Sequence, residues 1–392
     1  MAFLNNGLTG CDIVCISTSD WESPYGSRQH IMSGLVARGN RVLYVESQLS
    51  FLHILKDGFA GIKRLMRWFR GIRREKGNLY VYTLFPLFPF GNYFISVNSI
   101  NQAILGFNLK RLIKRLGFKD VLLWLYSINS SCLLKKMDER VSVYYCIEDF
   151  SSEINIPKRK NTMRFLEDLA LTNADVVFAC TRALASDRKD KRPDLHFIRN
   201  GVDFAAFDTG KDSMPVPFDL QNIFSPRIGF VGTLDSRIDT GLIRFLAENK
   251  KEWQIILIGK NLNRSRDFKD YPNIHLLGSK NHSSLPAYVM AMDACIIPYR
   301  TGGFHTYIFP LKTLEYLACG KPVVSTYLPE LEELRDVVKL STDKEDFVRN
   351  LELSLNERGN IEKRKGAASG LSWRSRIELI SAIVAEKLNK EK

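Results

Sequence analysis

The segment IFPLKTLEYLACGKPVVST, residues 308–326, places a lysine and a glutamate three residues apart in an otherwise apolar run. Pro310 suits the first turn of a helix, and the pattern predicts a short helix over 311–319. The free N–H groups and the dipole at the start of such a helix can hold a phosphate, and Lys312 adds a full positive charge. Glu315 lies on nearly the same face of this helix.

A carboxylate at position 315 fits two roles. It can accept two hydrogen bonds from the 2′- and 3′-hydroxyls of a ribose while the helix start holds a diphosphate, which would make the pair a clamp for a nucleotide sugar. Alternatively, Glu315 and Lys312 form an i, i+3 surface ion pair worth about 0.3 kcal/mol. The spacing alone allows both.

The elements that must position these residues are apolar strands alternating with stretches of helical spacing. Fully apolar runs of about six residues are typical of strands covered on both faces. The alternation predicts an α/β chain of two successive doubly wound parallel sheets, whose ligands bind at the carboxyl ends of the strands. We expect strands over 12–17, 41–46, 78–84, 121–127, 141–147 and 174–180, and then over 227–232, 253–259, 273–278, 294–299, 322–326 and 336–340.

The length of 392 residues favours two domains. Glycine, serine and three prolines predict a linker over 210–226, which separates a first domain at 1–209 from a second at 227–372. Residues 373–392 form an amphipathic helix with a lysine-rich end, which we expect to cross back to the first domain.

Composition and charge limit the setting of the protein. The first residues have no basic leader before an apolar run, so we expect a cytoplasmic protein. The seven cysteines are scattered without a CxxC pair, which favours buried reduced thiols over disulfides or a zinc site. The net charge of +13 implies an acidic partner: nucleic acid, an anionic membrane surface or a phosphorylated small molecule.

Nearly half of the excess charge lies in residues 51–78, which carry +6. Apolar side chains recur there at helical spacing, so the segment can lie in a membrane interface, where each basic residue is worth about 1 kcal/mol near anionic lipid. A core helix with a solvated basic face is the alternative, and nucleic acid is disfavoured because no recognised motif accompanies the charge. The apolar residues are Leu55, Phe59, Ile62, Met66 and Phe69.

Four segments carry a family resemblance: PLKTLEYLACGKPVV, IGFVGTLDSRIDTGLI, LHFIRNGVDFAAF and SDWESPYGSRQHIMSGLVARGNRVLYVE. They resemble the GT-B glycosyltransferases, especially the family-4-like bacterial enzymes of capsule, teichuronic acid and exopolysaccharide assembly. The resemblance implies two Rossmann-like domains facing a cleft. It also implies transfer of a sugar from a UDP- or GDP-linked donor, held mainly by the second domain, to a lipid-linked or polysaccharide acceptor, held mainly by the first.

The resemblance further implies a metal-independent reaction without a cofactor, in which helix starts and basic side chains neutralise the leaving diphosphate. The chain departs from the family pattern at Tyr307, where many retaining members have glutamate, and at Thr233 and Asp239, where many have arginine and lysine. We expect Asp239 to cap the helix that follows it. The donor-binding residues that we predict are Gly232, Thr233, Arg237, Lys260, Tyr307, Pro310, Leu311, Lys312 and Glu315.

These departures leave the stereochemistry open. Arg237 is the best-placed cation for stabilising the leaving group. If the reaction inverts the anomeric carbon, a first-domain carboxylate must act as general base, and Asp149 or its neighbour Glu148 at a strand end can do so. A turn-capping role for Asp149 is the simpler alternative.

The loop after the first strand has one glycine, so it is not the GxGxxG loop of a dinucleotide enzyme. We expect Gly26 to give the backbone room near the acceptor, and Arg28 and Gln29 to face the cleft; turn and capping roles are the alternative. Two other functions stay open at this point: a glycosyltransferase with a soluble small-molecule acceptor, and a non-catalytic GT-B-like subunit, which the tyrosine at 307 favours.

Overall fold

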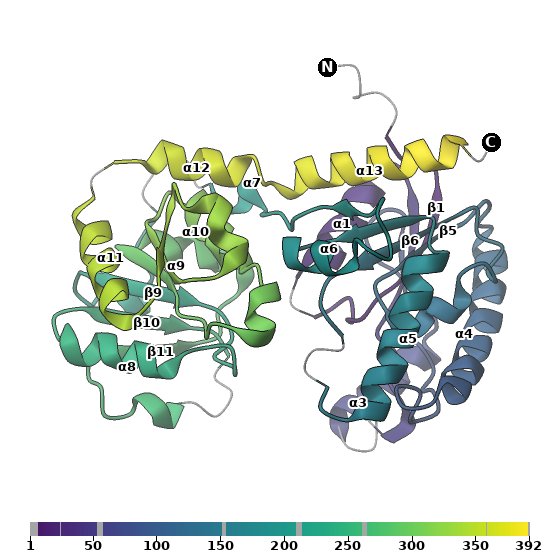
Figure 1. Cartoon of the computed structure of the whole chain (residues 1–392), viewed down its shortest axis with the longest axis horizontal. Coiled ribbons are helices and arrows are strands. Elements are labelled where there is room, and N and C mark those ends of the chain that lie inside the picture. The colour runs from purple at the N-terminus through teal and green to yellow at the C-terminus, as the bar shows by residue number, and fades with distance from the viewer. Residues whose placement is uncertain are drawn as a thin grey trace. The chain divides into compact units, whose positions relative to one another are not determined.

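The computed structural model describes residues 7–23, 25–52, 58–150, 154–208, 214–260, 265–357 and 359–390. The chain divides into two compact units (Figure 1). Unit 1 comprises Met1–Arg199 and Arg376–Lys392, and unit 2 comprises Asn200–Ser375. The described part of the segment in which we expected a linker therefore belongs to unit 2, and most of the C-terminal helix belongs to unit 1.

Unit 1 is built on an eight-stranded sheet of order β3-β4-β2-β1-β5-β6-β7-β8. Neighbouring strands are parallel except β3, which runs antiparallel to β4. The six strands predicted for this half are confirmed, whereas β3 and β8 were not predicted because they are short and carry charged or polar residues. The strands are β1 (Asp12–Ile16), β2 (Arg41–Val45), β3 (Ile72–Arg74), β4 (Leu79–Tyr82), β5 (Leu122–Leu125), β6 (Val141–Cys146), β7 (Val176–Ala179) and β8 (His196–Phe197).

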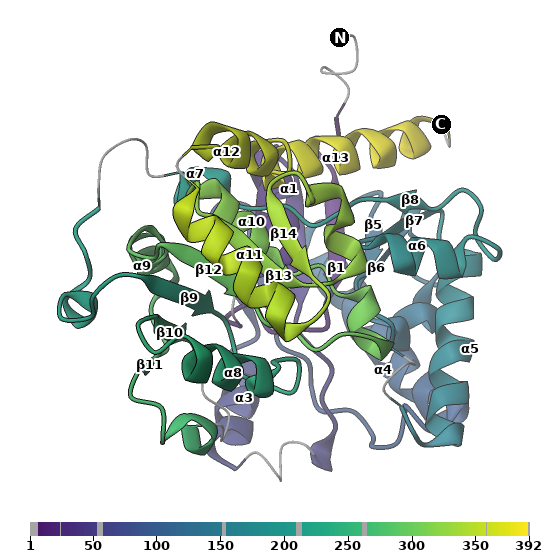
Figure 2. The ribbon, with the colours of Figure 1, turned by 60° about the vertical axis from the view of Figure 1, so that its left-hand side comes forward.

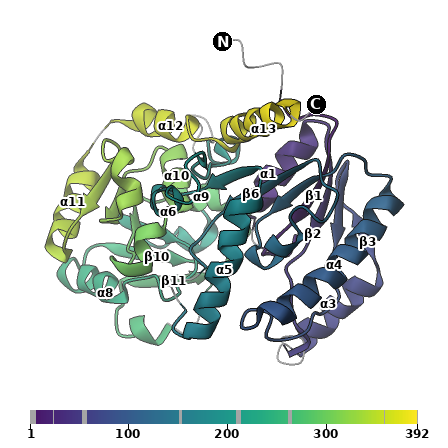
Figure 3. The same cartoon turned by 45° about the vertical axis from the view of Figure 1, so that its right-hand side comes forward.

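Helices cover the unit 1 sheet. The helices α4 and α5 both pack against the 3-10 helix η1 (Figures 1 and 2). The amphipathic helix α3 lies at the lower edge of the unit in Figures 1 and 3. The helices are α1 (Ser27–Ala37), α3 (Phe59–Phe69), α4 (Ile95–Leu116), η1 (Ile128–Leu133), α5 (Pro157–Asn173), α6 (Arg182–Arg188) and α13 (Trp373–Lys390).

Unit 2 is built on a six-stranded sheet of order β11-β10-β9-β12-β13-β14, all of whose neighbouring strands are parallel. All six predicted strands are confirmed. In both sheets the strands are added first on one side of the first strand and then on the other, so β1 and β9 each border a topological switch point. Ligands bind at this point in doubly wound folds. The strands are β9 (Arg227–Val231), β10 (Gln254–Ile258), β11 (Ile274–Gly278), β12 (Ala294–Ile297), β13 (Val323–Thr326) and β14 (Val338–Ser341).

The longer helices of unit 2 fall into two groups. Helix α8 packs beside α11, whereas α10 packs beside α7 and α12 (Figure 1). The helices are α7 (Phe204–Phe207), η2 (Phe218–Leu220), α8 (Thr240–Asn249), η3 (Ser265–Phe268), η4 (His282–Ser284), α9 (Leu285–Met290), η5 (Gly303–Tyr307), α10 (Leu311–Ala318), η6 (Pro329–Leu334), α11 (Lys344–Asn356) and α12 (Ile361–Ser369).

None of the seven cysteines, all of which lie in the described ranges, forms a disulfide bond, and five of them are buried. Burial raises the pKa of the Cys146 and Cys319 thiols to about 12, which keeps them protonated and unreactive near neutral pH. Within the described ranges, no helix combines the length and apolarity that crossing a bilayer requires.

Candidate functional site

The carboxyl ends of β9 and β10 form the first part of the candidate site. The two strands pair in register up to Val231 and Ile258, so the glycines that follow them lie side by side. Gly232 N–H donates to the Ile258 carbonyl at 2.8 Å. Gly259 has φ +148°, and a Cβ added there would lie 2.6 Å from the Gly232 carbonyl carbon. Only glycine fits at position 259 without moving the backbone of the predicted donor residue Gly232.

A buried tyrosine fixes α10 against the same strand end. The Val231 N–H donates to the Tyr316 hydroxyl at 2.7 Å, and Tyr316 is fully buried. Val231 precedes Gly232, and Tyr316 follows Glu315. This hydrogen bond therefore brings two of the predicted donor residues to one edge of the sheet. This role of Tyr316 was not predicted, because the residues around it in the sequence do not distinguish it from an ordinary core tyrosine.

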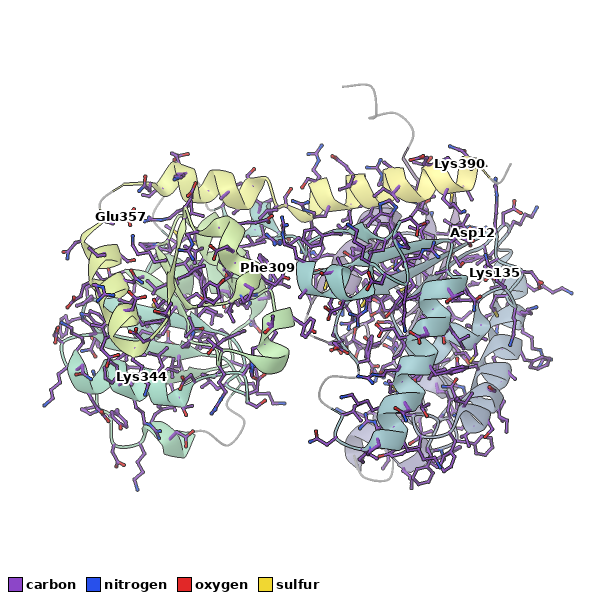
Figure 4. All side chains as sticks on the ribbon, in the orientation of Figure 1. Asp12, Lys135, Phe309, Lys344, Glu357 and Lys390 are labelled. Carbon is purple, nitrogen blue, oxygen red and sulfur yellow. The ribbon has the colours of Figure 1, made fainter. Side chains whose placement is uncertain are left out.

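The start of α10 is uncapped. The helix spans Leu311–Ala318, close to the predicted 311–319, and its N-cap residue is Pro310, with no side-chain hydrogen bond to the first turn. By contrast, Asp239 caps α8, as predicted, and Asp343 caps α11. Phe309, which leads into α10, is almost fully buried and anchors the segment (Figure 4). An uncapped start leaves N–H groups and the positive end of the helix dipole available to an anion.

Lys312 and Glu315 are paired with each other. The Lys312 Nζ donates to Glu315 Oε2 at 2.7 Å, and their side chains are 25% and 13% exposed. The ion pair that the spacing allowed is therefore present, but it is more buried than a surface pair. The predicted contact of Glu315 with a ribose stays a prediction.

The predicted donor residue Arg237 lies in the loop after β9, where it forms a two-point ion pair. Its Nε donates to Asp235 Oδ1 at 2.9 Å, and its Nη2 donates to Oδ2 at 2.5 Å. Its guanidinium carbon lies 5.9 Å from the centre of the Tyr299 ring. Burial raises the pKa of Tyr299, Arg237 opposes that rise, and Asp235 and Glu315 add to it. The charges of Arg237 and Glu315 therefore both act on the Tyr299 hydroxyl. Asp235 was not predicted, although its i, i+2 spacing from an arginine in a strand-end loop is a usable signal.

The remaining predicted donor residues lie in the loops after β9 and β10 and at the end of η5. Thr233 is half-buried and Lys260 is exposed. Their loops are joined because the Leu234 N–H donates to the Lys260 carbonyl at 3.1 Å. Tyr307 is half-buried at the end of η5.

In unit 1, the two candidate bases follow β6. Asp149 has a side chain that is 14% exposed, and its Oδ1 lies 3.9 Å from Arg188 Nη2. Arg188 pairs more closely with Glu167, at 2.8 Å. Glu148 is exposed. The Asp149 side chain is thus mostly buried whereas Glu148 is exposed, and a role as base stays a prediction for both.

The expectation that Gln29 faces a ligand is wrong. Gln29 is 1% exposed, and its Oε1 accepts from the N–H of Gly26, the N-cap residue of α1. Its Nε2 donates to the Asp20 carbonyl at 3.4 Å. Because Gln29 is the third residue of the helix, its amide reaches back to close the cap, and it holds the loop that follows β1. The capping alternative is therefore the correct one for Gly26 and Gln29.

Arg28 keeps spare hydrogen-bonding capacity. Its guanidinium carbon lies 5.8 Å from the centre of the Tyr126 ring, beyond the end of β5. Its Nε is buried, and no described residue accepts a hydrogen bond from it. Burial raises the pKa of the nearby Cys15 thiol, and the charge of Arg28 opposes this rise. Among the three predicted acceptor-side residues, Arg28 is the one suited to an anionic or hydroxylated ligand.

Comparison with known proteins agrees with this geometry. Residues 225–356, which contain the strand ends and α10 just described, match the family of glycosyl transferases group 1. Sucrose-phosphate synthase from Thermosynechococcus elongatus superposes with a TM-score of 0.69 at 15% identity, covering 97% of this chain and all of that one. A glycosyltransferase from Rickettsia africae gives 0.69 at 14% identity, covering 98% of this chain and 100% of that one. The chain has the GT-B fold, and its residues 225–356 match the group 1 glycosyl transferases.

Two further proteins similar to this GT-B-fold chain are named for a reaction or a ligand. A putative teichuronic acid biosynthesis glycosyltransferase, TuaH of Bacillus subtilis, is 28% identical over 186 residues. That match covers 45% of this chain and spans about half, 46%, of the relative. The structure of Anabaena HepE in complex with UDP-glucose has a TM-score of 0.67 at 15% identity, with 96% of this chain and 99% of that chain covered.

Three arginines of the basic segment, Arg64, Arg67 and Arg73, point inward to acidic residues. Arg64 Nη1 lies 2.5 Å from Asp20 Oδ2, and Arg67 Nη2 lies 2.8 Å from the same oxygen. Arg73 pairs at 3.2 Å with Glu46, which is fully buried. Burial opposes ionisation of Asp20, but Arg64, a hydrogen bond from Ser47 and Arg67 outweigh it and lower the pKa of that carboxyl. The expectation that the arginines of this segment face lipid is therefore wrong for Arg64, Arg67 and Arg73.

Three apolar side chains of α3 point outward, whereas the side chain of Phe59 lies outside the described part of the chain. Ile62 is 50% exposed, Met66 is 55% exposed and Phe69 is 77% exposed. A core helix with a solvated basic face, the alternative weighed above, is contradicted because the helix has the opposite orientation. The arginines of α3 point inward because they form ion pairs with two acids, Asp20 and Glu46. The sequence did not predict these ion pairs. Leu55, the first residue of the predicted apolar set, lies outside the described residues.

Proposed function

We propose that this protein transfers a sugar from a nucleoside diphosphate sugar to a lipid-linked or polysaccharide acceptor in cell-surface glycan assembly. The observation that carries the proposal is the edge of the unit 2 sheet where the uncapped start of α10, Glu315 and Arg237 gather. It is supported by the group 1 match over these residues and by the relative named for teichuronic acid biosynthesis. The HepE complex makes UDP-glucose the first donor to try.

In this proposal, the donor ribose displaces Lys312 from Glu315. The Glu315 carboxylate then accepts hydrogen bonds from the two ribose hydroxyls, and the freed ammonium turns to the diphosphate. The N–H groups at the start of α10 and Arg237 supply the remaining positive charge for the leaving group. Among the described residues, no three histidine, cysteine, aspartate or glutamate side chains gather as they would around a metal ion. We propose that these cations act without a metal, and that Asp149 accepts the proton of the acceptor hydroxyl.

A donor screen tests this proposal. We expect at least one among UDP-, GDP-, ADP- and dTDP-linked hexoses to raise the melting temperature, because a ligand at about 100 times its Kd stabilises the folded state by about 2.7 kcal/mol. The same donor should be hydrolysed slowly to the nucleoside diphosphate. The matching nucleoside monophosphate, which lacks the second phosphate, serves as the control and should shift the melting temperature less. The proposal fails if no donor binds and no nucleoside diphosphate is released.

We further propose that unit 1 binds an anionic membrane surface on the cytoplasmic side through α3. The outward apolar residues of α3 can enter the interface, and exposed cations beside them can contact lipid headgroups. These cations are Lys63, Arg70, Arg74 and Lys76.

Membrane binding has a direct test in vesicle co-sedimentation. The double variant Ile62→Gln with Phe69→Gln replaces the first and last exposed apolar residues of α3. Its affinity for phosphatidylglycerol-containing vesicles should be at least tenfold lower, because the two apolar side chains that would be buried in the membrane interface are gone. Arg70→Gln should lower it about fivefold, and only for anionic vesicles.

A matched control is available in unit 2, where Phe218 and Phe224 are 86% and 80% exposed. Phe218→Gln with Phe224→Gln should leave vesicle binding unchanged. All of these variants should melt within about 2 °C of the wild type, since exposed substitutions change stability by at most about 0.5 kcal/mol. Vesicle binding that survives the α3 changes would point to a soluble acceptor or to another membrane contact.

A further inference from the structure

Unit 1 contains a cavity of about 400 Å³ that none of the predicted site residues lines. It is bounded by α4, η1 and α5, and by the loops that follow β2 and β4. Both α4 and α5 pack against η1, and Figures 1 and 2 show these two helices within unit 1. The cavity lies beyond the carboxyl ends of the strands, where ligands bind in doubly wound folds.

Six of the sixteen residues that line this cavity carry neutral amides. The Gln102 Nε2 donates to Gln48 Oε1 at 3.0 Å, and the Gln48 Nε2 donates to Ser130 Oγ at 2.5 Å. Amides both donate and accept hydrogen bonds, which suits them to the hydroxyls of a sugar. The amide residues of the lining are Gln48, Asn92, Asn98, Asn101, Gln102 and Asn129.

Three buried polar atoms of the lining have no partner among the described residues. They are the Gln102 Oε1, the Asn129 Oδ1 and the Arg159 Nε. Gln102 is 2% exposed, so water outside the cavity cannot satisfy it. A buried acceptor left unpaired costs about 1–3 kcal/mol, so two acceptors and one donor around one cavity indicate a bound group that supplies both hydroxyl donors and acceptors.

The loops that form the cavity wall are held in place. Asn101 Oδ1 accepts from the Phe88 N–H, and Asn101 Nδ2 donates to the Phe88 carbonyl, both at 2.9 Å. The Leu87 N–H donates to the Leu49 carbonyl at 2.9 Å, which joins the two loops. Thr162 of α5 donates to the Tyr93 carbonyl at 3.1 Å. The cavity is therefore a pre-formed site, and it does not need to close around its ligand.

A row of aromatic rings links the cavity rim to the proposed membrane helix. Trp68 of α3 lies 4.7 Å from Phe85, and Phe85 lies 5.3 Å from Phe51, as measured between ring centres. The next residue, Leu52, lines the cavity and is 43% exposed. Phe88 and Phe90, which also line it, are 50% and 56% exposed. The amide residues of this cavity thus adjoin an exposed apolar surface at its mouth.

We propose that this cavity binds the saccharide head of a lipid-linked acceptor, while the lipid lies along the aromatic rim toward α3. The inference rests on the proposed function, because it names the place where the acceptor of that reaction is held. The amides bind the sugar hydroxyls, and Arg159 binds a hydroxyl or anionic substituent of the head. Recognition of a sugar next to an apolar rim selects acceptors that carry both parts.

Alkyl glycosides are suitable probes because they combine a sugar head with an apolar tail. The test uses the full chain with octyl glucoside, octyl galactoside and octyl N-acetylglucosaminide below their micelle concentrations, with binding followed by saturation-transfer NMR. We expect saturation of the sugar protons by the wild type. The double variant Asn129→Ala with Arg159→Met should weaken binding at least tenfold. Because the atoms removed have no partner among the described residues, this variant should melt at the wild-type temperature or above it.

The controls separate this cavity from a general affinity for sugars. Ser99→Ala with Lys136→Met changes a neighbouring cavity of about 230 Å³ beside α4 and should leave binding unaltered. Octanol, the tail without the sugar, should bind the Asn129→Ala, Arg159→Met variant as well as it binds the wild type.

The proposal would be overturned if the wild type and the cavity variant bound every glycoside with equal affinity. It would also be overturned if no glycoside bound, which is the result expected if the cavity holds only water. Donor thermal shift and hydrolysis are measured on the same variants. If these stay intact while glycoside binding is absent, the acceptor inference alone fails. If glycosides bind but no donor does, the cavity stands and the proposed transfer reaction fails.

Discussion

Glu315→Gln should lower kcat/KM for the nucleotide-sugar donor by about 100-fold while leaving the melting temperature nearly unchanged. Each hydrogen bond from a ribose hydroxyl to a carboxylate is worth about 1.5–3 kcal/mol, and each 1.4 kcal/mol is a factor of ten. Glutamine has the same shape and can still accept a hydrogen bond from Lys312, so the loss should fall on ligand binding. The measurement is the steady-state rate of nucleoside diphosphate release, together with a thermal melt.

A donor that lacks both ribose hydroxyls tests whether Glu315 acts through those hydroxyls. The wild type should lose about as much activity with a 2′,3′-dideoxy donor as Glu315→Gln loses with the normal one, and combining the two changes should cost little more. Glu332→Gln is the matched control, because Glu332 forms an i, i+3 pair with Arg335 at 2.8 Å on η6. If Glu315 serves only to hold Lys312, then Lys312→Met will match Glu315→Gln in every assay, and the dideoxy donor will react normally with the wild type.

Gly259→Ala should destabilise unit 2 by at least about 3 kcal/mol and abolish the donor-induced thermal shift. The residue has φ +148°, and the added methyl would lie 2.6 Å from the Gly232 carbonyl carbon. The backbone strain alone costs about 1–2 kcal/mol, and the clash with a neighbouring main chain adds about 1–3 kcal/mol. Either β9 or β10 must shift at its carboxyl end, which displaces Gly232 and the loop that carries Arg237. Calorimetry should show one transition lowered by about 6–12 °C.

Gly278→Ala separates the strain from the clash. Gly278 has φ +68° with no atom within 4 Å of an added Cβ, and its carbonyl accepts from the Gly259 N–H at 2.9 Å. This variant should cost only about 1–2 kcal/mol and keep the donor-induced shift. Equal melting temperatures for the two alanine variants would mean that the close approach at Gly259 is not a constraint in solution.

Much of the fold could be predicted from the sequence because it depends on local patterns. Twelve apolar runs predicted the strands β1, β2, β4 to β7 and β9 to β14, since a strand covered on both faces must be apolar throughout. The start of α10 and the Asp239 cap of α8 were also predictable, because proline and aspartate act on the backbone within a few residues. The strands β3 and β8 were missed because their stability comes from pairing with a neighbour and not from their own composition.

The candidate site was predictable in part for the same reason. Glu315, Lys312 and Arg237 stand in strand-end loops and helix starts, where residue type and spacing suggest chemistry. Gln29 was misassigned because its sequence position does not show that its amide turns back to the N–H of Gly26. Asp235 was missed because its pairing with Arg237 depends on how the loop after β9 folds.

The sequence by itself determined two doubly wound sheets, a short helix that begins at a proline in the second of them, and an amphipathic basic segment in the first. Only the tertiary structure decided which side of that segment faces outward. Ion pairing in a partly buried place requires acids within a few ångströms, and Asp20 and Glu46 come from the loops after β1 and β2, far from α3 in the chain. The same is true of the amide-lined cavity, whose walls come from five separate segments that only folding brings together.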